Sequence, residues 1–281
     1  MSFEQFAASA GLLPRRIIAD GQIHRCGTLK HPKSTNGAYM FDGARGFVWD
    51  WSGQASAQWW QDKNVRPWTD QEKRQWHAKR QADHKRKAEG YATAAKKAEQ
   101  MLSECEIDSH AYLKSKQLTE IQGMVHSSGA LLVPMRDVET NDITGVQSIF
   151  LNDAEDGFEK RFLPGMKAKG SVYRIGRGKR IILVEGYATG LSVDAAARQM
   201  RLDVSVLCCF SAGNLIHVSQ THGHLVMADN DASRTGEQAA IDTGLPWLMP
   251  QAVGTDWNDV HASNGLMAVC VALNELVRKA A

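Results

Sequence analysis

Three carboxylates in this sequence follow short apolar runs and have positions suited to metal-dependent chemistry. Glu185 ends the stretch that opens at Arg180 and directly follows its apolar residues 181–184, and Asp229 and Asp231 follow the run that begins at Leu225. Uninterrupted apolar runs of this length are typical of buried strands in a parallel sheet. Ligands bind beyond the carboxyl ends of such strands, where the three acids would meet. Carboxylates gathered there repel one another unless a cation neutralises them, and their hard oxygens suit Mg²⁺ or Mn²⁺.

The elements around these acids predict an α/β domain. Residues 188–200 have the composition of a helix and 204–210 form another apolar run, so the order strand, helix, strand indicates a βαβ unit and a doubly wound sheet. A further strand is expected at 245–249, and an apolar closing helix at 266–277. The alternative is that the three acids only cap strand ends in an ordinary α/β domain.

The string Val184-Glu185-Gly186-Tyr187, with Asp229-Asn230-Asp231 downstream, resembles the Toprim domain shared by topoisomerases and bacterial-type primases. The wider string 184–190 most resembles the primases of phages and mobile elements. The resemblance implies catalytic and metal-binding roles for Glu185, Asp229 and Asp231, and places Gly186 with the nucleotide- or template-binding residues. The segment 255–261 resembles the family's late acidic motif, so Asp256 either joins the metal ligands or caps a short helix.

Basic residues concentrate just before the acidic centre. In the replicative primases, the subdomain before Toprim presents basic residues across a groove from the metals. The resemblance therefore implies nucleotide or template binding by Lys160, Arg161 and Arg174, with ordinary surface charge as the alternative. Because consecutive side chains of a strand point to opposite faces, only one of Lys160 and Arg161 is expected to reach the groove.

A turn of small residues follows the apolar run 204–210 and opens a helix. Ser211, Gly213 and Asn214 lie in this turn. Backbone N–H groups at such a place can bind an anion, so the turn is a candidate loop for nucleotide phosphates. The alternative is that it is only a tight turn.

The chain before the acidic centre divides by composition. Residues 1–61 predict a small aromatic-rich β module, with a helix at 3–13 and strands at 21–26, 37–41 and 47–51. This module resembles the N-terminal module of mobile-element primases, whose replicative relatives carry a zinc ribbon there. Cys26 is its only cysteine, so no zinc is expected. Its aromatic residues either form a core or stack bases, with Arg25 as a candidate DNA contact.

Residues 62–106 predict a basic helical linker that begins at a capping box, Thr69 and Glu72, and that Gly90 is expected to break or bend. The linker either is a solvated helix or follows a nucleic-acid backbone through Arg80, Lys85 and Arg86. Residues 107–176, with a hairpin of strands at 130–135 and 145–151, would form the mixed α+β N-terminal part of the primase core. Residues 177–281 would form the Toprim domain, a parallel sheet flanked by helices.

Composition sets further bounds. The chain has 281 residues, a formal net charge of +2 and five cysteines without a C-x-x-C pair, which fits a reducing cytoplasm. Residues 1–5 lack the features of a signal peptide, and no run approaches the ~20 apolar residues of a membrane span. No P-loop motif is present, so a replicative helicase would be a separate partner.

The resemblance as a whole implies a DNA primase of a phage or plasmid. It would make short RNA primers on a single-stranded DNA template from nucleoside triphosphates, by metal-dependent nucleotidyl transfer. Two alternatives remain. One is a Toprim-type nuclease, in which the same metal cluster activates water. The other is a non-catalytic DNA-binding replication accessory of a mobile element, against which the three-acid pattern argues.

Overall fold

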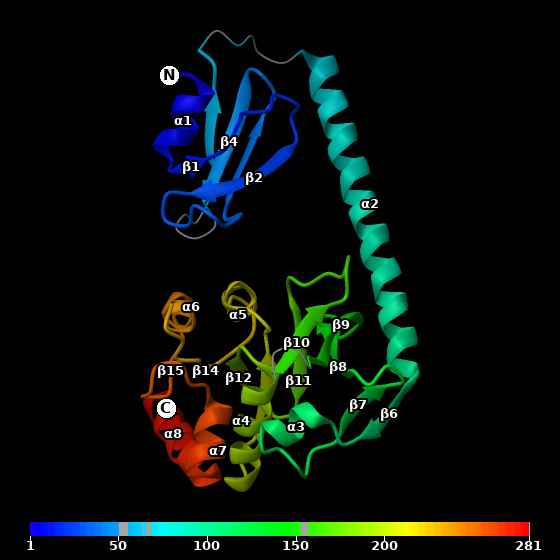
Figure 1. Ribbon diagram of the computed structural model, residues 1–281, viewed down its shortest axis with the longest axis vertical. Coiled ribbons are helices and arrows are strands. Elements are labelled where there is room, and N and C mark those ends of the chain that lie inside the picture. Colours follow the sequence, from blue (N-terminus) through cyan, green and yellow to red (C-terminus); the bar gives the residue numbers. More distant parts are fainter. Residues whose placement is uncertain (51–55, 64, 66–68, 153–156, 281) are drawn as a thin grey trace. The chain divides into compact units, whose positions relative to one another are not determined.

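The computed structural model describes residues 1–50, 56–63, 65, 69–152 and 157–280. They divide into two compact units, Met1–Arg80 and Gln81–Ala281 (Figure 1). Helix α2 (Asp70–Ser103) begins in the first unit and ends in the second. The predicted strand end at Trp51 lies outside the described residues.

The first unit is a five-stranded antiparallel sheet with one helix packed on it. Its elements are α1 (Phe3–Ser9), β1 (Leu12–Leu13), β2 (Ile23–Thr28), β3 (Gly37–Phe41), β4 (Arg45–Asp50) and β5 (Gln58–Gln61), and the strand order is β1-β2-β3-β4-β5. Phe3 stacks on Phe41 at 4.4 Å and packs on buried Tyr39. These aromatic side chains therefore form the core of the unit. The predicted helix at 3–13 is shorter, because Leu12 and Leu13 pair with β2 instead.

Helix α2 begins at the predicted capping box. The Thr69 N–H donates to Glu72 Oε2 at 2.8 Å, and the Glu72 N–H donates to Thr69 Oγ1 at 3.3 Å. The prediction of a break at Gly90 is wrong, because the helix runs through it to Ser103. A helix interior tolerates glycine at a cost of about 1 kcal/mol, and packing near its end offsets that cost. Ala94 and Ala98 are buried there against the second unit's core.

The second unit is built on one mixed sheet. Its elements after α2 are β6 (Cys105–Asp108), α3 (Ala111–Ser115), β7 (Gly123–His126), β8 (Leu131–Asp137), β9 (Ile143–Asn152), β10 (Gly157–Phe162), β11 (Ser171–Ile175), β12 (Arg180–Val184), α4 (Tyr187–Gln199), β13 (Val204–Cys208), α5 (Ala212–Ser219), β14 (Leu225–Met227), α6 (Thr235–Thr243), β15 (Trp247–Leu248), α7 (Trp257–Asn264) and α8 (Leu266–Lys279). The main strand order is β10-β9-β8-β11-β13-β12-β14-β15, and β7 joins β8 to β6. The strands β13, β12, β14 and β15 are parallel, and β11 joins them antiparallel to β13.

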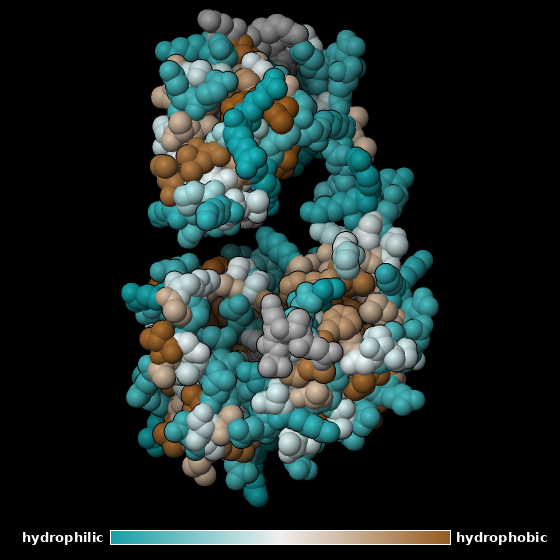
Figure 2. Space-filling model, viewed as in Figure 1, coloured by the Kyte–Doolittle hydropathy of each residue, from teal (hydrophilic) through white to brown (hydrophobic). Residues whose placement is uncertain are grey.

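Helices cover both faces of the parallel part, as predicted (Figure 1). Ile182 and Val184 of β12 pack on one face against α4, α7 and α8, while Leu183 packs on the other against α5 and α6. Strands buried on both faces explain the uninterrupted apolar runs in the sequence. Figure 2 shows apolar residues scattered among hydrophilic ones on the visible face of each unit. No described helix is long and apolar enough to cross a membrane.

The sheet of the second unit curls toward its parallel part. The ring of Phe162, at the end of β10, meets the ring of Phe210, just after β13, at a centroid distance of 6.1 Å. In a flat sheet, the four strand steps from β10 to β13 would cover about 19 Å at ~4.8 Å each. A register shift at Met135/Arg136 in β8 adds local bending of the kind a β-bulge produces. The curl brings β10 over the carboxyl ends of the parallel strands.

Candidate active site

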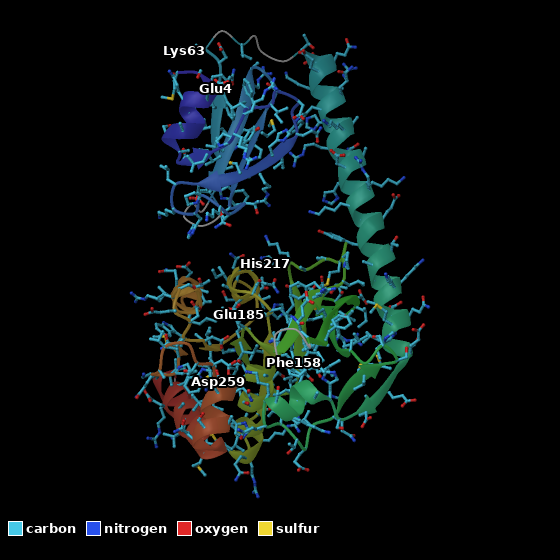
Figure 3. All side chains as sticks on the ribbon, viewed as in Figure 1. Glu4, Lys63, Phe158, Glu185, His217 and Asp259 are labelled. Atoms are coloured by element: carbon cyan, nitrogen blue, oxygen red, sulfur yellow. The ribbon has the colours of Figure 1, made fainter. Side chains whose placement is uncertain are left out.

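The acids predicted from the sequence stand at the carboxyl ends of neighbouring parallel strands. Glu185 follows β12, where the chain turns into α4, and is half-buried (Figure 3). Asp229 follows β14 and is half-buried as well. Burial raises the pKa of Glu185, and the charge of Asp231 raises it further. This edge of the sheet therefore holds mutually repelling carboxylates.

Asp229 is the acid most strongly perturbed by its surroundings. Burial raises its pKa to about 7, and the charges of Asp256, Glu185 and Asp231 add to the effect. The hydroxyl of Thr189, in the first turn of α4, donates to Asp229 Oδ1 at 3.4 Å and opposes part of the increase. Asp229 is therefore poised to exchange a proton, or to take up a cation, near neutral pH.

Asp231 has the opposite environment. Ser233 Oγ donates to its Oδ1, and the backbone N–H groups of Thr235 and Gly236 donate to Oδ1 and Oδ2 at 3.2 and 2.9 Å. The Ser233 bond comes first among the interactions that lower the pKa of Asp231. Gly236 is required in this turn, because a Cβ there would lie 2.5 Å from the Asp229 carbonyl oxygen. The loop thus holds a charged Asp231 beside a readily protonated Asp229.

Asp256 is both a helix cap and a neighbour of the acids. Its Oδ1 accepts the N–H groups of Asn258 and Asp259 at 2.7 and 2.9 Å, and Asp259 completes the capping box of α7. Its charge is also the first electrostatic contribution, after burial, to the raised pKa of Asp229. The helix-cap interpretation of Asp256 therefore holds, and its carboxylate also belongs to the acidic cluster.

Lys160 is the predicted basic residue whose pKa responds to the charges of this cluster. Its Nζ lies 5.1 Å from the ring centroid of buried Tyr112. Although the residue as a whole is exposed, desolvation of the ammonium lowers its pKa, and Asp256 and Asp229 oppose the decrease. A lysine on β10 thus faces one acid that follows β14 and another that precedes α7, across the curled sheet.

Arg161 and Arg174 are placed differently. Arg161 pairs with Glu159 on the other face of β10, with 2.6 Å between its Nη2 and Glu159 Oε2. Arg174 is exposed on β11 opposite Leu207, so its side chain leaves the sheet on the face that α5 and α6 cover. Alternation along the strands therefore puts only Lys160, of these three, against the acids.

The small-residue turn before α5 is largely occupied by structural bonds. Ser211 caps α5 by accepting the Asn214 N–H at 3.3 Å. The buried Asn214 amide accepts the Gly170 N–H at 2.7 Å and donates to the carbonyls of Ser171 and Cys209, both at 2.8 Å. The Asn214 side chain thus fixes α5 to β11. Only the exposed backbone around Ser211 and Gly213 remains open to an anion.

The remaining predicted DNA contacts belong to the first unit and to helix α2. Arg25 is exposed on β2 of the first unit. Arg80, Lys85 and Arg86 are exposed along α2, where Arg80 lies over the ring of Trp76 at 4.8 Å and Arg86 pairs with Asp83. The structure gives these residues a solvent-facing position and assigns them no ligand.

The donor set of the acidic cluster suits a hard divalent cation. Glu185, Asp229 and Asp231 offer carboxylate oxygens, and their repulsion is what a cation would relieve. Within the described ranges, no three Asp, Glu, His or Cys side chains are grouped closely enough to hold one metal ion. The three acids therefore lie within electrostatic range of one another without forming a closed coordination sphere.

Several residues of the cluster escaped the sequence analysis. The Thr189 hydroxyl donates a hydrogen bond to Asp229, and the Ser233 hydroxyl donates one to Asp231. The ring of Tyr112 lies under the ammonium of Lys160. A signal existed for Ser233, because an Asp at a strand end with a Ser two residues later is typical of turns closed by side-chain hydrogen bonds. No local signal marks Tyr112, because its partner Lys160 is distant in the sequence.

Comparison with known proteins gives a similar solved structure and a family match for part of the second unit. One similar chain comes from a solved bacteriophage T7 assembly, in which the lagging-strand DNA polymerase interacts with primase domains of two gp4 subunits bound to an RNA/DNA hybrid and dTTP. That chain is 16% identical, the match covers 59% of this chain and 92% of that one, and the TM-score is 0.38. Residues 180–266 match the family model described as the Toprim domain. The second unit of this chain thus contains a Toprim domain, with Glu185, Asp229 and Asp231 at its strand ends.

Proposed function

We propose that this chain is a DNA primase that makes short RNA primers on single-stranded DNA by metal-dependent nucleotidyl transfer. The observation that carries the proposal is the acidic cluster at the strand ends of a Toprim domain, where burial, together with repulsion from the neighbouring acids, raises the pKa of Asp229 to about 7. A cluster of this kind suits phosphoryl chemistry, because a divalent cation bound by the carboxylates would also neutralise charge on the phosphate.

In this proposal Glu185, Asp229 and Asp231 hold Mg²⁺ or Mn²⁺. The bound ion supplies charge neutralisation at the phosphoryl oxygens during transfer. Asp231 is fixed and charged before any ligand arrives, because Ser233, Thr235 and Gly236 bind its oxygens. Asp229 gives up its proton near neutral pH and then adds a second negative charge. Glu185 either shares the ion or accepts the proton of the attacking hydroxyl.

Lys160 would contact the triphosphate of the incoming nucleotide. Its ammonium faces Asp229 and Asp256, so a phosphate entering this space meets a positive group opposite the acids. The backbone of the exposed residues Ser211 and Gly213, at the start of α5, provides a further place for phosphate oxygens. A helicase acting as a separate protein, and a cytoplasmic site of action, belong to the same proposal.

The test combines labelled ribonucleotides, a single-stranded DNA template and Mg²⁺ or Mn²⁺, with products resolved by length. New short oligomers from the parent protein, lost in Asp229→Asn and Asp231→Asn, would support the primase. A control variant, Glu275→Gln, changes an acid on α8 that pairs with Lys279 and should keep full activity. Shortened template would favour the nuclease instead. Template binding without either product would favour the non-catalytic accessory.

A further inference from the structure

A pocket of about 690 Å³ lies in the second unit, lined by α4, by β11 and by residues 120–122. Aromatic and aliphatic side chains form much of its lining, among them Tyr173, Ile175, Tyr187 and Leu191. Ile121 packs against the main core of the unit, so the wall formed by residues 120–122 is held in place. The volume of the pocket falls in the ~300–1,000 Å³ range of ligand sites.

Two tyrosine rings meet in this pocket. Tyr173 and Tyr187 pack edge to face, with ring centroids 5.4 Å apart and an angle of 70° between the ring planes. Tyr187 is only 5% exposed. In the part of the chain that the structure describes, its hydroxyl and that of Tyr173 have no hydrogen-bond partner. A buried hydroxyl without a partner costs free energy, so a polar ligand in the pocket would stabilise both side chains.

A buried carboxylate shares the pocket with these rings. Asp194 is 6% exposed, and its Oδ2 lies 2.6 Å from Arg198 Nη2, whose side chain is 73% exposed. Burial raises the pKa of Asp194, although the charge of Arg198 opposes the increase. The arginine therefore does not replace all the hydration that the carboxylate loses, and a further cation would stabilise the charged form.

The charges of the lining favour a cationic ligand. Glu120 is exposed at the pocket and, within the described ranges, forms no ion pair. Two acids therefore face the single cation Arg198, so phosphates are repelled, whereas carboxylates and aromatic rings both attract organic cations. Because the acids lie on different walls and share the pocket with apolar side chains, several ammonium groups joined by methylene chains match it better than one ammonium ion.

We propose that this pocket binds a linear aliphatic polyamine, with one ammonium group at Asp194, another at Glu120 and the methylene chain against Tyr173. The tyrosine hydroxyls offer oxygen acceptors for the remaining N–H groups. Arg198 releases Asp194 to the ligand, because an exposed ion pair contributes little stability. The lining contains none of the three Toprim acids, and the inference does not rest on the nucleotidyl transfer proposed above.

The test measures spermidine binding to the full-length protein by isothermal titration calorimetry, without Mg²⁺ or nucleotides. We expect Asp194→Asn to weaken binding about tenfold, the size of one charge-assisted contact. Tyr173→Leu should weaken it several-fold, whereas Tyr173→Phe should retain most of the affinity because the ring remains. Arg198→Ala should tighten binding several-fold, because it removes the cation that competes for Asp194.

Two control variants separate this pocket from other carboxylates. Asp242→Asn removes an exposed carboxylate from α6 that accepts a hydrogen bond from Gln238, and it should bind spermidine as the parent does. Asp229→Asn should do so as well, because Asp229 belongs to the acidic cluster and does not line the pocket.

Three outcomes would overturn the proposal. Asp194→Asn, shown to be folded by circular dichroism, could bind spermidine as tightly as the parent. Arg198→Ala could weaken binding, which would show that the arginine does not compete with the amine. Asp229→Asn could lose binding while Asp194→Asn keeps it, which would assign the amine to the Toprim acids. Because the assay contains no nucleotide, failure of primer synthesis would leave its result intact, and loss of spermidine binding would leave the proposed roles of the acids standing.

Discussion

Replacing Asp229 with Asn should stabilise the metal-free protein at alkaline pH. The folded-state pKa of Asp229 is raised from 3.8 to about 7, so ionising this carboxyl costs folding free energy. Roughly three pH units correspond to about 4 kcal/mol at pH 8, where the group is charged in both states. The penalty is absent below the unfolded pKa, because the carboxyl is then protonated in both states. It grows as pH rises through the window from about 4 to about 7.

Hydrogen exchange of the β12 and β13 amides, in EDTA, provides the measurement, because these buried strands report opening of the second unit separately from the first. Asp229→Asn should slow their exchange at pH 8 by an amount equivalent to as much as ~4 kcal/mol, and by about 2 kcal/mol at pH 5. Addition of Mg²⁺ should stabilise the parent more than the variant. The control Glu275→Gln should show no pH-dependent gain.

A variant that is no more stable than the parent at pH 8 would refute this reasoning. So would a gain of the same size at pH 4 and pH 8, because a charge-independent gain would indicate better packing. If Mg²⁺ stabilised parent and variant equally, Asp229 would not be a ligand.

Three further substitutions separate the roles of the neighbouring residues. Thr189→Val should raise the pKa of Asp229 further and move the acidic limb of the pH–rate profile to higher pH, whereas Thr189→Ser should not. Lys160→Ala should raise KM for nucleotide about tenfold, the equivalent of ~1.4 kcal/mol, while Arg161→Ala stays within twofold in the same titration. Asp256→Ala should lower the free energy of urea unfolding by about 1 kcal/mol through loss of the α7 cap, and Asp256→Asn should retain most of it.

The sequence revealed the parts of the fold whose burial is complete. The strands β12, β13 and β14 are apolar on both faces, so their runs and the acids that end them stand out without any structure. Strands that are only half-buried have a less distinct apolar pattern in the sequence. Strand β15 has two half-buried residues, Trp247 and Leu248, where five residues were predicted, because it lies at the sheet edge.

Contacts between residues far apart in the sequence could not be predicted from local sequence patterns. Lys160 and Tyr112 are 48 positions apart in the sequence but in contact, and Lys160 faces the acids only because the sheet curls. Asp256 carried two open interpretations, and the structure shows that a helix cap can also act on an acidic cluster. Gly90 does not end α2, because a glycine in an otherwise strong helical segment weakens the helix without ending it.

The curl of the sheet has a consequence for how the proposed site would accommodate its ligand. Lys160 and Asp229 lie on opposite sides of the proposed site but belong to one hydrogen-bonded sheet, with Lys160 on β10 and Asp229 after β14. Their separation is therefore set by curvature, which every intervening strand shares, and no single hinge can change it. A lengthened hairpin tip between β8 and β9 should leave this spacing untouched, whereas a one-residue slip at the Met135/Arg136 irregularity would alter it from a distance. The curvature of the strands would then limit the size of the ligand that fits between Lys160 and Asp229.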